Sequence, residues 1–123
     1  MPHPTITPLR EKTDKDAFNR VVAYIDNNLI DMPNLKTICH TTGFSCTYLE
    51  QVFKSKTGRS VMEYCKITKL ERAKELMREG DYTFTQIASV LNYSSIHYFS
   101  KIFKKYFGMT PTEYSSSVKL KSL

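Results

Sequence analysis

Two sets of polar side chains in this sequence have the residue types that contact duplex DNA. The first set is Thr47, Glu50, Gln51 and Lys54, and the second is His97, Ser100, Lys101 and Lys104. Both sets advance along the chain in the same steps of three, one and three residues. That spacing puts each set on one face of a helix. Such side chains hydrogen-bond to base edges or pair with phosphates, so the pattern predicts two DNA-contacting helices.

The elements that carry the two sets form an internal repeat. Residues 37–45 align with residues 86–94 at an offset of 49, and residues after the turn align at an offset of 50. Ile38 matches Ile87, and Phe53 matches Phe103. A solenoid needs at least three repeats, so two copies indicate two small domains.

In the first copy, local signals predict a short helix, a turn and a longer helix. Asn34 is the predicted N-cap of a helix that ends at Thr42, and Gly43 supplies a positive φ. Ser45 is the predicted N-cap of a second helix, which ends near Thr57. This is the helix-turn-helix pattern, although two ordinary helical hairpins remain the alternative.

The second copy repeats these signals with different residues. Thr83 is the predicted N-cap of a helix that ends at Leu91, and Asn92 takes the place of the glycine. Ser94 is the predicted N-cap of a helix that ends near Phe107. This last segment holds three lysines and no acidic residue.

These motifs resemble the DNA-binding domain of the AraC/XylS family of bacterial transcription regulators. The resemblance is carried by Ile87-Ala88, by HYFSKIFKK over residues 97–105 and by GMTPTEY over residues 108–114. The first copy adds Tyr48-Leu49, Phe53-Lys54 and Thr57-Gly58. The match covers residues 17–114. The chain departs from the family at Asn92-Tyr93, where Gly-Phe is usual, and at Tyr114-Ser115, where Tyr-Arg is usual.

A long helix over residues 60–80 joins the two copies. Val61, Tyr64, Ile67 and Leu70 begin its apolar stripe, and Ser60 with Glu63 forms a predicted capping box. The fold expected is all-α, with about seven helices and two helix-turn-helix subdomains joined by this central helix.

We expect five segments along the chain. They are a disordered tail or linker at 1–13, a first subdomain at 14–59, the linking helix at 60–80, a second subdomain at 81–115 and a frayed tail at 116–123. The first helix is predicted over 16–29, and Thr110, Pro111 and Glu113 predict the start of the last helix.

Composition favours an anionic partner. The net charge is +6, with a sequence pI near 9.2. No apolar run is long enough for a membrane span, and the first residues lack a signal-peptide pattern. Cytoplasmic localisation at the nucleoid is therefore expected. Basic charge alone also fits a module that binds an acidic protein.

The remaining reactive side chains do not form a catalytic or metal site. Cys39, Cys46 and Cys65 are an odd set without paired zinc-ligand spacing, and Cys39 is expected in the core. We expect the three thiols to be unpaired, as in a reducing compartment, with Cys46 open to oxidation. No Ser/His/Asp order suggests an enzyme, and no cofactor is expected.

The predicted DNA contacts divide into two classes. Base contacts are expected from Thr47, Glu50, Gln51, His97, Ser100 and Lys101. Phosphate contacts are expected from Ser45, Lys54, Lys66, Lys69, Ser94, Lys104 and Lys105. Glu50 suits cytosine, Gln51 suits adenine and Lys101 suits guanine. Lys66 and Lys69 also fit a merely solvated surface.

The family resemblance implies a sequence-specific regulator of transcription, usually an activator that works with RNA polymerase. Two second helices, near 46–57 and 95–107, would enter successive major grooves of double-stranded DNA. The domain would bind DNA as a monomer without a small molecule or a membrane. The alternatives are a protein-interaction module and the DNA-binding fragment of a larger, effector-responsive regulator whose N-terminal domain dimerises it.

Overall fold

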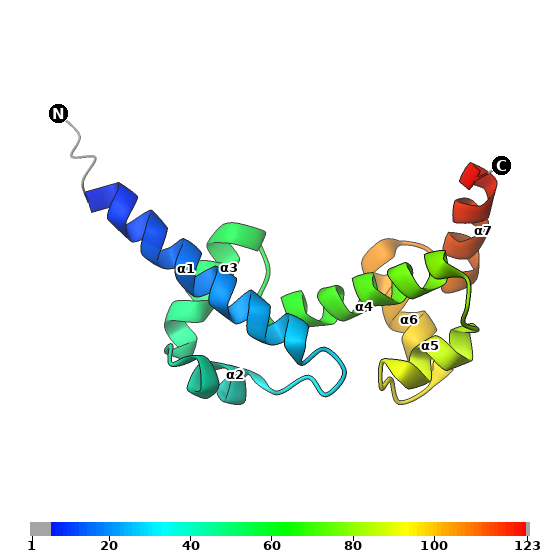
Figure 1. Ribbon diagram of the computed structural model, residues 1–123, viewed down its shortest axis with the longest axis horizontal. Coiled ribbons are helices and arrows are strands. Elements are labelled where there is room, and N and C mark those ends of the chain that lie inside the picture. The colour runs from blue at the N-terminus through cyan, green and yellow to red at the C-terminus, as the bar shows by residue number, and fades with distance from the viewer. Residues whose placement is uncertain (1–5, 123) are drawn as a thin grey trace. The chain divides into compact units, whose positions relative to one another are not determined.

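The computed structural model of the protein describes residues 6–122, and all its regular structure in that range is helical. The helices are α1 (Ile6–Asn27), α2 (Leu35–Thr42), α3 (Cys46–Thr57), α4 (Val61–Glu79), α5 (Phe84–Val90), α6 (Ile96–Phe107) and α7 (Pro111–Ser122) (Figure 1). The all-α prediction is confirmed for this range. None of the helices in residues 6–122 combines the length and the apolar composition that a membrane span requires.

The chain divides into two compact units, Met1–Cys65 and Lys66–Leu123. The boundary falls inside α4, so the residues of this helix are shared between two cores. Val61 and Cys65 belong to the first core, whereas Leu70, Ala73 and Leu76 belong to the second. The helix predicted as a separate segment thus supplies apolar residues to both helix-turn-helix units.

In the first unit, α1 packs against both α2 and α3 (Figure 1). Its core contains Ile25, Ile38, Leu49 and Phe53, which have no exposed surface. The Phe18 ring of α1 lies 4.8 Å from the Phe53 ring of α3, measured between ring centroids. Burial of these side chains fixes the face that α3 turns outward.

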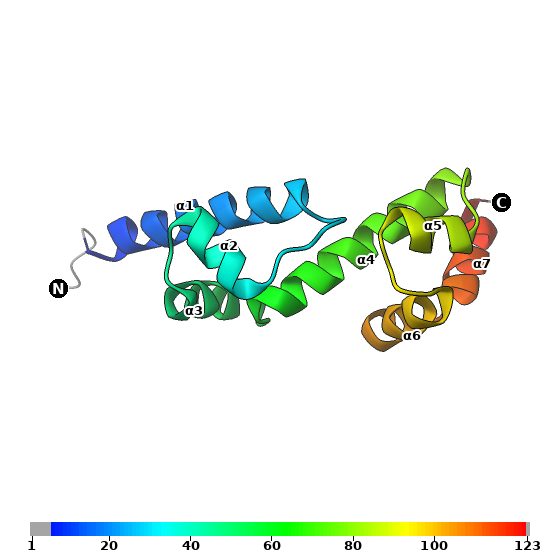
Figure 2. The same ribbon diagram turned by 90° about the horizontal axis from the view of Figure 1, so that it is seen from below.

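In the second unit, α5, α6 and α7 gather around the C-terminal part of α4 (Figure 2). Leu70, Ile87, Phe99 and Phe103 have no exposed surface. Tyr114 of α7 closes this core, with its ring centroid 5.8 Å from that of Phe103. The apolar pattern of the repeat thus builds two separate cores of the same kind.

Most of the predicted helix starts are confirmed. The Asn34 side chain accepts a hydrogen bond from the Thr37 N–H at 2.9 Å, and the Thr83 hydroxyl accepts one from the Gln86 N–H at 3.1 Å. At α7, the Thr110 N–H donates to Glu113 and the Glu113 N–H donates to Thr110, both at 3.1 Å. The bond from the Thr110 backbone N–H, aided by the Thr110 hydroxyl, holds the pKa of the Glu113 carboxyl below its usual value.

The prediction for the N-terminal segment was wrong over residues 6–13. Helix α1 begins at Ile6 instead of residue 16, so this stretch is helical and not a disordered linker. Pro8 does not interrupt the helix because it lies in the first turn, where backbone N–H groups have no helical acceptor. Residues 1–5 lie outside the described range, and the predicted tail there stays a prediction.

The prediction of a frayed tail after residue 115 was also wrong, because α7 continues to Ser122. Two contacts anchor the start of this helix. The Arg78 guanidinium donates a hydrogen bond to the Tyr114 hydroxyl at 2.7 Å, and Tyr114 packs on the second core. Val118, one turn later, is half-buried. These contacts stabilise a sequence whose polar composition alone suggests fraying.

Candidate nucleic-acid interface

Helix α3, the second helix of the first helix-turn-helix, presents a polar face to solvent. Thr47, Gln51 and Lys54 are exposed, whereas Leu49 and Phe53 are fully buried. The Lys54 ammonium lies 3.4 Å from the Gly58 carbonyl oxygen, to which it donates a hydrogen bond. Apart from Glu50, which is half-buried, the predicted contacts on α3 therefore lie on an open surface. We call α3 and its counterpart α6 the recognition helices.

An open groove of about 800 Å³ follows the polar face of α3. It is lined by Cys46, Thr47, Glu50, Gln51, Lys54, Ser55 and Ser60. Four of these seven residues are predicted DNA contacts. The groove gathers hydroxyl, amide, carboxylate and ammonium groups, which are the groups that contact base edges and phosphates.

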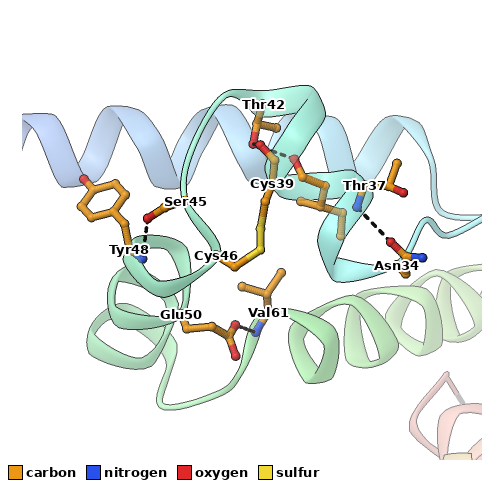
Figure 3. Close-up of a disulfide and its surroundings, with 10 residues drawn as sticks. Asn34, Thr37, Cys39, Thr42, Ser45, Cys46, Tyr48, Glu50 and Val61 are labelled. Carbon is orange, nitrogen blue, oxygen red and sulfur yellow. Dashed lines mark hydrogen bonds between the residues drawn. A yellow bond between two sulfur atoms is a disulfide. The ribbon is translucent and has the colours of Figure 1, made fainter.

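The turn before α3 is fixed by backbone and side-chain hydrogen bonds. Gly43 has a φ of 82°, and its N–H donates to the Cys39 carbonyl at 2.9 Å. The Ser45 hydroxyl accepts a hydrogen bond from the Tyr48 N–H at 3.1 Å (Figure 3). Gly43 and Ser45 thus have the predicted roles in the turn, and the cap bond uses the Ser45 hydroxyl only as an acceptor, so its hydrogen can still be donated.

Glu50 has a structural partner that sequence analysis missed. One of its carboxylate oxygens accepts a hydrogen bond from the Val61 N–H at 2.8 Å (Figure 3). Val61 is the first residue of α4, and its N–H has no acceptor within that helix. The carboxylate therefore joins the middle of α3 to the start of α4. This partner lies eleven residues away, beyond the reach of a helical periodicity argument.

The second unit has no counterpart of this bond. At the offset of 50, Glu50 corresponds to Ser100, and Val61 corresponds to Pro111. Proline at the first position of α7 has no N–H, so no acceptor is needed there. Ser100 is half-buried on α6.

Helix α6 presents a more basic face than α3. His97, Lys101, Lys104 and Lys105 are all exposed. The opposite face is buried through Phe99, Ile102 and Phe103. Since α6 carries three lysines and no acidic residue, its outer surface suits a polyanion.

The turn before α6 differs by one residue from the prediction. Ser95, not Ser94, is the N-cap, and its hydroxyl accepts a hydrogen bond from the Tyr98 N–H at 3.0 Å. Ser94 is exposed and precedes the cap, so it is the extra residue of this copy. Asn92 has a φ of 61°, which confirms that it takes the glycine place.

The tyrosines at equivalent positions of the two recognition helices have different surroundings. The Tyr48 hydroxyl donates a hydrogen bond to the Asp14 carboxylate at 2.6 Å. This bond, aided by desolvation and by the charge of Asp14, raises the pKa of Tyr48 to about 12. Tyr98 is 45% exposed. The Asp14 contact was missed because the first helix was predicted to begin at residue 16.

The two lysines predicted on the central helix also differ. Lys66 is exposed. Lys69 is half-buried, with its ammonium nitrogen 4.5 Å from the centroid of the Tyr93 ring. Such a cation–π contact holds the lysine next to the turn of the second helix-turn-helix. Tyr93 itself has a buried hydroxyl without a hydrogen-bond partner, and burial raises its pKa above the usual value.

The prediction of three unpaired cysteines was wrong for two of them. Cys39 of α2 and Cys46, the first residue of α3, form a disulfide across the turn (Figure 3). Their separation of seven residues suggests no pair until the turn brings the two helices together. Cys65 is the free cysteine among the described residues and is buried. Burial raises the pKa of its thiol to about 12.

No group of His, Cys, Asp and Glu side chains in residues 6–122 could hold a metal ion. His97 lies on the exposed face of α6, and His40 is exposed near the end of α2. The described part of the chain therefore offers two polar helix faces as its candidate site.

Comparison with known proteins is consistent with this architecture. Residues 35–117 match a family model described as a helix-turn-helix domain. A solved structure of a transcriptional regulator from Chromobacterium violaceum, described as an AraC-type DNA-binding domain-containing protein, has a TM-score of 0.79. Its identity is 23%, and the match covers 87% of this chain and 96% of that one, which shows a shared fold.

Two curated relatives match over most of the chain. The F1 operon positive regulatory protein of Yersinia pestis is 34% identical over 97 residues, covering 78% of this chain and 32% of the relative. The multiple antibiotic resistance protein MarA of Escherichia coli is 25% identical over 105 residues, covering 85% of this chain and 83% of MarA. The chain spans between about a third and a half of the length of the first curated relatives it matches.

Proposed function

Because the chain belongs to the AraC-type helix-turn-helix family of DNA-binding transcription regulators, we propose that both of its recognition helices contact one duplex site. Regulators of this family are not enzymes, in agreement with the sequence analysis. The observation that carries the proposal is the repeated polar face. Gln51 and Lys54 of α3, like Lys101 and Lys104 of α6, are exposed at positions 50 residues apart.

The proposed base contacts come from the N-terminal halves of the two helices. In α3 they are Thr47 and Gln51, with Gln51 suited to adenine. In α6 they are His97, Ser100 and Lys101, with Lys101 suited to guanine. Recognition helices contact base edges with their N-terminal residues, which supports this choice.

We assign Glu50 a structural role instead of the cytosine contact that its residue type suggests. Its hydrogen bond to Val61 commits one carboxylate oxygen to the start of α4. We propose that Glu50 holds α3 in register with α4, instead of accepting a hydrogen bond from a cytosine amine.

The proposed phosphate contacts flank the base-contacting residues. They are Ser45 and Lys54 in the first unit, and Lys66, Lys69, Ser94, Lys104 and Lys105 in the second. Lys54, Lys66, Lys104 and Lys105 are exposed cations, which release condensed counterions when they pair with phosphates. Lys69 would bind a phosphate beside the Tyr93 ring.

We further propose that α3 and α6 enter successive major grooves, about 34 Å apart along the duplex. Helix α4 has 19 residues, and a helix of that length rises about 28 Å at roughly 1.5 Å per residue. A monomer would then cover about two turns of DNA and need no palindromic site. In this scheme residues 14–59 and 81–115 are the binding subdomains and residues 60–80 connect them.

Activation of transcription through RNA polymerase is the regulatory outcome we propose. The F1 operon relative is named a positive regulatory protein, which supports activation over repression. Such a regulator would act in the cytoplasm at the nucleoid. In a longer protein, an additional domain would supply effector binding or dimerisation.

The test is selection of duplexes from a randomised pool of about two helical turns, at near-physiological salt. We expect two short enriched boxes about one turn apart. Retention without enrichment would contradict base recognition and leave phosphate binding alone. No retention by the folded protein would contradict DNA binding and favour the protein-interaction module.

A further inference from the structure

The disulfide between Cys39 and Cys46 ties the two helices of the first helix-turn-helix to each other. The two Cα atoms are 5.6 Å apart, within the range that a disulfide spans without backbone movement. Cys39 lies in the middle of α2, and Cys46 is the first residue of α3 (Figure 3). The bond therefore crosses the turn that sets the start of a recognition helix.

The two sulfur-bearing residues differ in access to solvent. Cys39 is only 5% exposed and belongs to the first core beside Ile38 and Leu49. Cys46 is half-buried and lines the groove along α3. A small oxidant can thus reach Cys46 from the groove, whereas Cys39 is buried in the core on the other side of Cys46.

The second unit shows that this turn folds without a disulfide. Ala88 stands where Cys39 would be and Ile96 stands where Cys46 would be. The backbone bond from Tyr93 N–H to the Ala88 carbonyl, at 2.8 Å, matches the one from Phe44 N–H to the Cys39 carbonyl at 3.2 Å. The disulfide is therefore an addition to a turn that its hydrogen bonds already define.

We propose that Cys39 and Cys46 are a reversible redox site, closed by a peroxide and reopened by a small thiol, that fixes the start of α3 when closed. This goes beyond DNA binding, since the site and its chemistry need no DNA.

Both oxygen atoms of the peroxide leave as water when the disulfide forms. The Cys46 sulfur attacks one oxygen of hydrogen peroxide, which gives a sulfenic acid on Cys46 and one water. The Cys39 sulfur then attacks the Cys46 sulfur, so that the S–S bond forms and the hydroxyl leaves as a second water. Two thiols lose two electrons and two protons to the peroxide. Two molecules of a small thiol such as glutathione reverse the reaction and are themselves joined as a disulfide.

Opening the site leaves the start of α3 held by fewer links. The Ser45 cap and the Gly43 and Phe44 backbone bonds remain, but the covalent tie from Cys46 to the core is lost. Local opening of this turn then becomes more frequent, and backbone amides that the turn protects exchange faster with solvent.

The experiment compares amide hydrogen exchange in the peroxide-treated protein and in the same sample after reduction with glutathione. We expect exchange at Gly43, Phe44, Tyr48 and Leu49 to be slower in the oxidised form, by about tenfold or more. Amides of Tyr93, Tyr98 and Phe99 serve as internal controls in the second unit and should not change. Equal exchange in the two forms would overturn the proposal.

Peptide mapping establishes the chemistry in the same samples. We expect a Cys39–Cys46 link within one chain after peroxide, and its loss after glutathione. Recovery of Cys46 as a stable sulfinic acid, or of links between chains only, would overturn the proposed pair.

Three variants make the test specific. Cys46→Ser and Cys39→Ala should both abolish the redox difference in exchange, and the alanine reproduces the residue of the second unit. Cys65→Ala should keep the difference, because Cys65 is outside the pair. A redox difference that persists in Cys46→Ser would overturn the proposal. Because no DNA is present, failure of DNA binding would count against the proposed function alone.

Discussion

The two helix-turn-helix units solve one structural problem with different chemistry. In the first unit, Gly43 makes the turn, a disulfide ties the helices and Glu50 accepts the free N–H of the next helix. In the second unit, Asn92 makes the turn and Pro111 removes the N–H that would need an acceptor. The shared requirement is the geometry, and different residues meet it in the two units.

Both units have an aromatic core, but the first adds a disulfide and a bond from the Val61 N–H to the Glu50 carboxylate, which the second lacks at the equivalent positions. Phe99, Phe103, Phe107 and Tyr93 form neighbouring ring contacts in the second core, at centroid distances from 4.8 to 5.8 Å. Substitutions in the two units test which of these contacts each unit needs.

The largest effect is expected for the disulfide. Cys46→Ser should lower the unfolding free energy of the oxidised first unit by about 2–3 kcal/mol, since a loop of this length loses that much chain-entropy stabilisation. Native-state hydrogen exchange at Leu49 should report the loss, while exchange at Phe99 should stay unchanged. Equal losses at both amides would show that the two units unfold together.

The next contrast concerns base contacts at equivalent positions of α3 and α6. Gln51→Ala and Lys101→Ala should each weaken binding to the selected duplex by about 1–3 kcal/mol, through one base position each. Binding to duplexes with single substitutions measures this selectivity. Lys104→Ala is the control, and it should weaken binding to every duplex alike and lower the salt slope by about one. An equal loss of affinity for every duplex in Lys101→Ala would contradict the proposed base contact of Lys101.

The third contrast concerns the first residue of the helix that follows each recognition helix, which has an N–H in the first unit and none in the second. Glu50→Ala should destabilise the first unit by about 1–2 kcal/mol because the Val61 N–H loses its acceptor. Ser100→Ala should change stability by less than about 0.5 kcal/mol, since Pro111 has no N–H to satisfy. Denaturant unfolding measures both. Glu50→Gln keeps a side-chain oxygen as acceptor for the Val61 N–H and should retain most of the stability, and a loss equal to that of Glu50→Ala would argue against the hydrogen bond as the cause.

The fourth contrast concerns the buried tyrosine of the second turn. Tyr93→Phe removes a buried hydroxyl without a partner and should raise the unfolding free energy by about 1 kcal/mol. Tyr98→Phe, which removes an exposed hydroxyl, is the matched control and should leave stability unchanged. Thermal unfolding compares the two variants. A loss of stability in Tyr93→Phe would mean that the hydroxyl has a stabilising contact.

The smallest effect is a pH dependence confined to the first unit. The folded pKa of Tyr48 is raised from 10.0 to about 12, so the protonated phenol is the form that stabilises the fold. This contribution is complete below pH 10 and disappears as the pH rises through 12. Tyr48→Phe should therefore remove a small alkaline loss of stability, measured as the difference between the two unfolding curves. Parallel curves would contradict the Asp14 contact.

Sequence patterns predicted the features that depend on neighbouring residues. The caps at Asn34, Ser45 and Thr83 and the turn at Asn92 follow from local chemistry, and so do the buried faces of α3 and α6. The repeat itself located the candidate contact residues, whose assignment to bases and phosphates stays a prediction.

The features that sequence analysis missed depend on packing between distant segments. Glu50 can accept the hydrogen bond from the Val61 N–H only when the start of α4 lies beside α3. Cys39 and Cys46 come within bonding distance only when the turn between α2 and α3 folds. The hydrogen bond between Tyr48 and Asp14 requires α1 to begin before residue 16, and the helix in fact begins at Ile6. The shift from Ser94 to Ser95 has another cause, because two adjacent serines are equivalent as caps until the turn fixes one of them.

The absence of an N–H at Pro111 has a consequence for how the target site can diverge. No hydrogen bond to the start of the next helix depends on position 100, because Pro111 has no N–H to satisfy. Position 50 supplies the acceptor for the Val61 N–H, so its replacement by a side chain without an acceptor costs stability. On the proposed DNA-binding scheme, a substitution at position 100 would alter a half-site preference without disturbing the start of the next helix, whereas a substitution at position 50 would also leave the Val61 N–H without its acceptor.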